Sequence, residues 1–206
     1  MEIFLSLGFV SYLGSAVAYL FLLLVYLIGI RRQTNKAFLL LVIAALVWSL
    51  TLTLSQIGSS ISFKLITLIE FLRYFAWFHV LHLAAGYYID RTTKYEIANP
   101  LSPLSIGIFF LISLVSLGLN DELVSLFGLQ TPSVIQFGWM LGFSILGLLL
   151  TEQVLRNSAE IDRSSIKLLC ISAAAIFAYD FFVFSNAMLL QQIDYDFWSA
   201  RGIVNI

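Results

Sequence analysis

The chain has 206 residues, of which 60% are apolar and only 11% are Asp, Glu, Lys or Arg. A soluble domain carries about 25% charged residues, and a mean hydropathy of +0.95 leaves too few charges here to cover a water-facing surface. The net charge of −1 excludes a basic field that binds nucleic acid. The single cysteine, Cys170, excludes a disulfide framework within one chain. These values predict an integral membrane protein in contact with the lipid bilayer.

Long, continuously apolar segments recur along the chain. They cover residues 3–30, 37–57, 64–89, 101–119, 134–155 and 166–190, with a further segment that starts near Ser199. A bilayer core takes about 20 apolar residues as a helix, whereas strands of a membrane barrel alternate over about ten residues. The pattern predicts an all-α, polytopic transmembrane helix bundle with six full spans and the start of a seventh.

Lys and Arg are distributed unevenly among the predicted loops. Eight of the 11 lie in or beside the first, third and fifth loops: Arg31, Arg32, Lys36, Arg91, Lys94, Arg156, Arg163 and Lys167. Only Lys64 and Arg201 flank the even-numbered loops. Because cytoplasmic loops carry an excess of Lys and Arg, we expect the N-terminus to lie outside.

The last segment, from Ser199 to Ile206, is too short to cross a bilayer. It is either a short interfacial tail or the start of a span in a longer protein, and the second interpretation is favoured. No Pro-rich, Gly/Ser-rich or low-complexity linker interrupts the chain. Residues 1–206 are therefore expected to form a single transmembrane domain, as a fragment that ends within span seven.

Polar and ionisable groups inside the predicted spans are the first candidates for function, because each charged group costs about 2.5–3.5 kcal/mol at a helix centre. The third and sixth segments contain Glu70, Arg73, His79, His82, Asp180 and Asn186.

Depth in the membrane indicates which of these groups can meet. Counted from Lys64 at 1.5 Å per residue, Glu70 lies about 9 Å deep and Arg73 about 13 Å deep. Counted from Leu190, Asp180 lies about 15 Å deep and Asn186 about 6 Å deep. Arg201 follows Trp198 by one turn near the same outer level. We therefore predict a polar cluster of Glu70, Arg73, Asp180, Asn186 and Arg201, with Asp180–Arg73 as the leading ion pair.

Three roles remain open for this cluster. It could be a structural ion network that fixes the register of the helices, the lining of a cavity that senses a ligand or signal, or part of a proton or ion pathway.

His79 and His82 are the only histidines, and their spacing places them on one helix face. One chain therefore cannot supply both axial ligands of a haem from this pair. Glu70 lies nine residues from His79, on the opposite side of the same helix. We predict hydrogen-bonded interior histidines, with no metal and no cofactor.

Other residues fit helix packing better than chemistry. Gly138 and Gly142 form a small-xxx-small pattern, which indicates either close helix contact or two lipid-facing glycines. Trp48 and Trp77 fall in mid-span and are expected in the core, whereas Glu152 and Arg156 are spaced to pair along one helix. No protease, P-loop, hydrolase or dinucleotide motif is present, so the sequence predicts no catalytic residue.

The last quarter of the chain carries a more specific pattern. Its stretches are Thr151–Asn157, Ile166–Cys170, Phe177–Asp180, Ile193–Asp194 and Trp198–Asn205. The residues that carry it are Glu152, Gln153, Arg156, Asn157, Lys167, Phe177, Tyr179, Asp180, Asp194, Trp198, Ala200, Arg201, Gly202 and Asn205. Residues 151–206 are thereby similar to the N-terminal membrane region of PrsK-type histidine kinases, associated with the PEP-CTERM/exosortase system of Gram-negative bacteria. The chain departs from that family after Arg163, where the family has an aromatic residue, and at Phe184-Ser-Asn186, where it has Tyr and an acid.

This resemblance implies a sensor region in the bacterial inner membrane. In the family, further spans, a GAF-like domain and an ATP-dependent histidine kinase core follow, and a response regulator is the partner. A homodimer is a further expectation. Glu152, Gln153, Arg156, Asn157 and Lys167 would then couple the membrane region to the cytoplasmic side. The alternative functions are a small proton- or ion-coupled transporter that uses Glu70, Asp180 and the histidines and, less favoured, an intramembrane enzyme.

Overall fold

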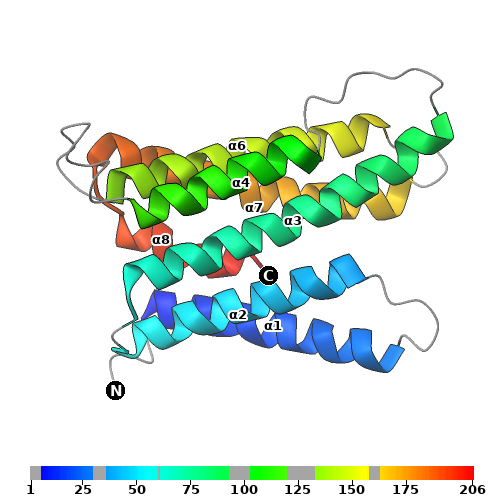
Figure 1. Ribbon diagram of the computed structural model, residues 1–206. Helices are drawn as coiled ribbons and strands as arrows, with labels where there is room; N and C mark the ends of the chain where they lie inside the picture. The colour runs from blue at the N-terminus through cyan, green and yellow to red at the C-terminus, as the bar shows by residue number, and fades with distance from the viewer. Residues whose placement is uncertain (1–5, 30–35, 60, 93–102, 120–132, 158–162) are drawn as a thin grey trace. The chain divides into compact units, whose positions relative to one another are not determined.

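The computed structural model describes residues 6–29, 36–59, 61–92, 103–119, 133–157 and 163–206. These residues form seven α-helices and no β-strand (Figure 1). The helices are α1 (Leu7–Gly29), α2 (Lys36–Gln56), α3 (Phe63–Thr92), α4 (Pro103–Gly118), α6 (Ser133–Asn157), α7 (Arg163–Leu190) and α8 (Tyr195–Val204). The all-α prediction is confirmed for the described residues, and each apolar segment corresponds to one helix.

Polar caps explain where several helices begin. The Ser6 hydroxyl accepts a hydrogen bond from Phe9 N at the start of α1, and Ser62 does the same for Leu65 N at the start of α3. The Asp194 carboxylate accepts from Asp196 N at 3.0 Å. This cap starts α8 at Tyr195, four residues before the predicted start near Ser199.

Four helical stretches are long and apolar enough to span a membrane: Leu7–Ile28, Lys36–Gln56, Val134–Arg156 and Ile166–Leu190. The described part of α4 has 16 residues and reaches about 24 Å, less than the bilayer core of about 30 Å. Helix α3 has 30 residues, but Lys64, Glu70 and Arg73 lie in its first half. The structure thus supports a multi-pass membrane protein with four candidate spans, and the six full spans stay a prediction.

Large apolar side chains cover the outer faces of the candidate spans. Val17, Phe21 and Ile28 of α1 and Leu189 of α7 are exposed. Large apolar side chains exposed along a helix are typical of helices that contact lipid. The outside N-terminus also stays a prediction, because several of the cations that indicate orientation, Arg31, Arg32 and Lys94 among them, lie outside the described residues.

The chain divides into two compact units. The first contains Met1–Ala76 and Ile193–Ile206, and the second contains Trp77–Gln192. Helix α3 contributes its first half to one unit and its second half to the other. The single transmembrane domain stays a prediction.

In the first unit, α1 and α2 lie side by side and α8 packs against α1 (Figure 1). The closest approach is at Gly202, where an added Cβ would lie 2.3 Å from Ser11 Oγ and 2.6 Å from Ser11 O. The same Ser11 hydroxyl accepts a hydrogen bond from Ile203 N at 3.0 Å. Only glycine fits at position 202, so this contact fixes the register of α8 on α1.

In the second unit, α6 packs against α7 and an aromatic cluster fills the interior. Phe78 lies within 6.0 Å, centroid to centroid, of both Phe143 and Phe177. An added Cβ at Gly147 would lie 2.6 Å from three atoms of the Phe177 ring. Gly147 therefore permits the close contact between α6 and α7.

The small-xxx-small pattern does not form one packing face. A Cβ at Gly142 would lie 3.0 Å from Phe109 of α4, whereas a Cβ at Gly138 would meet nothing within 4 Å. Of the two interpretations left open by the sequence, close packing applies to Gly142 and not to Gly138, because open space faces Gly138.

We predict that Gly147→Ala destabilises the protein by about 1–3 kcal/mol, because the new methyl group overpacks the Phe177 ring. The matched control on the same helix is Gly138→Ala, which has room for its methyl group and removes the helix penalty of glycine. Thermal unfolding in detergent micelles measures both. Equal shifts in the two variants would show that the Gly147 contact does not constrain packing.

Candidate functional site

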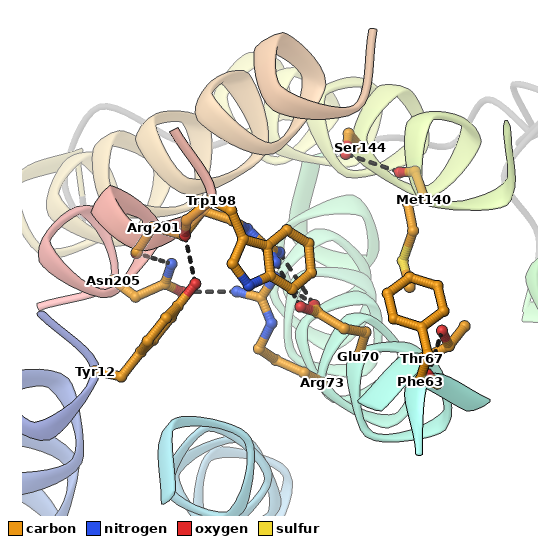
Figure 2. A network of polar contacts seen from close by, with 10 residues as sticks. All are labelled: Tyr12, Phe63, Thr67, Glu70, Arg73, Met140, Ser144, Trp198, Arg201 and Asn205. Carbon is orange, nitrogen blue, oxygen red and sulfur yellow. Dashed lines mark hydrogen bonds and ion pairs between the residues drawn. The ribbon is translucent and has the colours of Figure 1, made fainter. Parts of the chain in front are cut away.

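The centre of the first unit holds a carboxylate between two guanidinium groups (Figure 2). Arg201 Nη1 donates to Glu70 Oε1 at 2.5 Å, and Arg201 Nη2 donates to Glu70 Oε2 at 3.1 Å. Arg73 Nη2 donates to the same Oε2 at 3.1 Å. Two bonds from the terminal nitrogens of one guanidinium to the two oxygens of one carboxylate form the bidentate pairing that gives Arg–carboxylate contacts their directionality.

Helical spacing places these groups. Glu70 and Arg73 are three residues apart on one face of α3. Asn205, the C-cap of α8, follows Arg201 by four residues. Arg73 Nη1 donates to Asn205 Oδ1 at 2.6 Å, and Asn205 Nδ2 donates to the Arg201 carbonyl at 2.8 Å. Each helix thus contributes two side chains, and the four interlock.

Aromatic rings surround the guanidinium groups. Cζ of Arg73 lies 4.3 Å from the centroid of the Trp48 ring, and Cζ of Arg201 lies 5.4 Å from it. Arg201 also lies over the Trp198 ring at 4.6 Å. A cation over an aromatic face is attracted by the ring quadrupole, most strongly by Trp. Helix α2 therefore takes part in the site through Trp48.

Helix α1 contributes Tyr12, whose hydroxyl donates a hydrogen bond to the carbonyl of Trp198 (Figure 2). The Tyr12 ring meets the Trp48 ring edge-on, with centroids 5.6 Å apart. The site thus joins all four helical segments of the first unit.

The three charged side chains of the site are completely buried. The Glu70, Arg73 and Arg201 side chains are each 0% exposed. Removing charges from water costs several kcal/mol per ion, and only good geometry with additional hydrogen bonds offsets this cost. A buried ion network is weak evidence for stability, and we expect this one to act by selecting one arrangement of the helices.

The structure brings together three of the five residues of the predicted cluster, Glu70, Arg73 and Arg201. Asp180 is fully buried and Asn186 is half-buried, and both belong to α7 in the second unit. The Asp180–Arg73 pair stays a prediction.

Sequence reasoning missed two members of the site. Tyr12 lies on an apolar helix and gives no signal of its own, whereas Asn205 follows Arg201 at helical spacing and was recognisable as its neighbour. Trp48, expected in the core, is fully buried as predicted, and it also contacts both guanidinium groups.

The residues predicted to couple the membrane region to the cytoplasm lie on α6 and α7. The expected pair is confirmed, since Arg156 Nη2 lies 2.6 Å from Glu152 Oε1 on an exposed face. Gln153 is half-buried and Lys167 is exposed. Asn157 ends α6, and its side chain lies outside the described residues. The coupling role stays a prediction.

The histidines differ from expectation. His79 is exposed and His82 is half-buried, so the prediction of an interior position is wrong for His79. Nine residues separate His79 from the buried Glu70, which places the two side chains on opposite sides of α3.

No protein-family model, curated protein or solved structure matches this chain.

We predict that Glu70→Gln lowers the free energy of unfolding by about 3–5 kcal/mol, because it leaves two guanidinium groups buried without their shared carboxylate. The matched control is Glu152→Gln, which breaks an exposed pair worth about 0.3–0.5 kcal/mol. Unfolding midpoints in the same detergent measure the difference. A Glu70→Gln midpoint equal to that of the control would contradict the central place of this carboxylate.

We also predict that Gly202→Ala releases α8 from α1, because the new Cβ would overlap backbone atoms of Ser11. Overpacking of about 1–3 kcal/mol should speed amide hydrogen exchange across α8 by about tenfold or more. The control is Gly107→Ala, whose Cβ would meet nothing within 4 Å. Unchanged protection of α8 in Gly202→Ala would show that this contact does not hold the helix.

Proposed function

We propose that this chain is the membrane-embedded sensory and anchoring module of a two-component histidine kinase similar to the PrsK type. Four apolar helices long enough to span a membrane support the membrane part of the proposal. The similarity of residues 151–206 supports the kinase part. In this proposal the chain lies in a bacterial inner membrane, and cytoplasmic GAF and kinase domains act downstream on a response regulator. A homodimer of the parent protein is part of the same proposal.

The observation that carries the proposal is the buried link between α8 and the rest of the first unit. Glu70 of α3 and Tyr12 of α1 both hold α8, through Arg201 and through the Trp198 carbonyl. Movement of α1 or α3 therefore breaks a discrete set of bonds instead of deforming a continuous surface. Two discrete arrangements of packed helices are what a switch between signalling states requires.

The transporter alternative fits this geometry less well. A proton relay needs a carboxylate that exchanges protons readily, whereas both oxygens of Glu70 already accept hydrogen bonds from guanidinium groups. Proton transfer through Glu70 would first have to break the network that holds α8.

The test uses the protein expressed with all coding sequence that follows Ile206, in membrane vesicles with labelled ATP. We expect acid-labile phosphate on histidine, and we expect Glu70→Gln to change its amount severalfold, because the variant loosens α8. The exposed Lys36→Gln on α2 is the control and should leave labelling unchanged.

Two results would overturn the proposal. One is a downstream coding sequence that encodes no kinase. The other is a liposome-reconstituted protein that dissipates a pH gradient and loses this activity in Asp180→Asn, which would establish the transporter.

A further inference from the structure

The geometry points to a binding site for a small guanidinium-type cation, formed by Glu70 and Trp48. In this structure the Arg201 side chain occupies the site as an internal ligand. Glu70 belongs to α3 and Trp48 to α2, whereas Arg201 belongs to α8 and lies 131 residues from Glu70 in the sequence. The binding site itself follows from the contacts. Its coupling to kinase activity rests on the proposed function.

The site has the chemistry that recognises a planar organic cation. Glu70 presents both carboxylate oxygens to one guanidinium, at 2.5 Å and 3.1 Å. Bidentate geometry favours a guanidinium over an ammonium group, which is a compact point charge. Arg201 Cζ also lies 5.4 Å from the centroid of the Trp48 ring, and proteins use aromatic faces to recognise organic cations.

The two arginines differ in how they reach Glu70. Arg73 is three residues away on the same helix and keeps its position whenever α3 is folded. Arg201 depends on the docking of α8, a helix of ten residues that is too short to be stable without tertiary contacts. Arg201 is therefore the cation that can leave.

Exchange of Arg201 for a free cation preserves the charge of the site. Glu70, Arg73 and one further cation remain together in either state, so no uncompensated carboxylate is created. A cation that binds only when Arg201 is absent must shift α8 toward its released state, in proportion to its concentration over its dissociation constant. The ligand thus competes with α8 for Glu70.

The first test is rescue of Arg201→Ala by ethylguanidinium in detergent micelles. We expect a saturable rise of the unfolding midpoint by about 3 °C in Arg201→Ala. Wild type should show a smaller rise at the same concentration, because Arg201 competes for the site. Ethylurea, which has a similar shape without the charge, is the ligand control. The double variant Arg201→Ala with Glu70→Gln should lose the rescue.

A second measurement keeps Arg201 intact, in case Arg201→Ala does not fold. A Cβ at Gly8 would lie 2.9 Å from Ser199 Oγ, close enough for a disulfide between cysteines at these positions when α8 is docked. In Gly8→Cys with Ser199→Cys and Cys170→Ser, ethylguanidinium should slow disulfide formation severalfold, and ethylurea should not.

The proposal is overturned if ethylguanidinium and ethylurea act alike in the disulfide measurement. It is also overturned if a folded Arg201→Ala shows no rescue, or if the rescue persists without Glu70. None of these readouts involves phosphate transfer, so failure of the kinase proposal and failure of the cation site are distinguishable.

Discussion

The structure of the first unit depends on one carboxylate that receives two guanidinium groups away from water. Glu70 bonds Arg201 through both oxygens and Arg73 through one, and all three side chains are completely buried. Buried charges are costly unless an opposite charge and hydrogen bonds compensate them, as Glu70 and Asn205 do for the terminal nitrogens of the two arginines. The positions of α3 and α8 therefore follow from this ion network, and Trp48 and Tyr12 extend the same constraint to α2 and α1.

Small residues make the required approach possible. Between apolar helices in lipid there is no hydrophobic driving force, so association depends on close packing and hydrogen bonds. Gly202 lets α8 reach the Ser11 backbone in the first unit, and Gly147 lets α6 reach the Phe177 ring in the second. A shift of α8 by one residue would replace Gly202 with a side chain and also turn Arg201 away from Glu70. The glycine contact and the ion network thus select the same register.

Much of the candidate site could be predicted from the depth at which each charged residue would lie in the membrane. Counting residues from the predicted ends of the helices placed Glu70, Arg73 and Arg201 near one level, and the structure has them in contact. The same counting could not find Tyr12, because its role depends on a backbone carbonyl of a distant helix. It also gave no way to distinguish Gly138 from Gly147, because the need for glycine depends on which atoms of other helices lie next to the position.

The sequence by itself determined the helices and their apolar character, because hydropathy and capping are local properties of successive residues. It also determined that Glu70, Arg73 and Arg201 must find partners, because a charge among apolar residues is costly wherever the helix lies. Only the tertiary structure decided who those partners are: Arg201 with Glu70, Asn205 with Arg73, and Trp48 beside both arginines. These choices depend on the contact of α8 with α1 at Gly202, which joins segments almost two hundred residues apart.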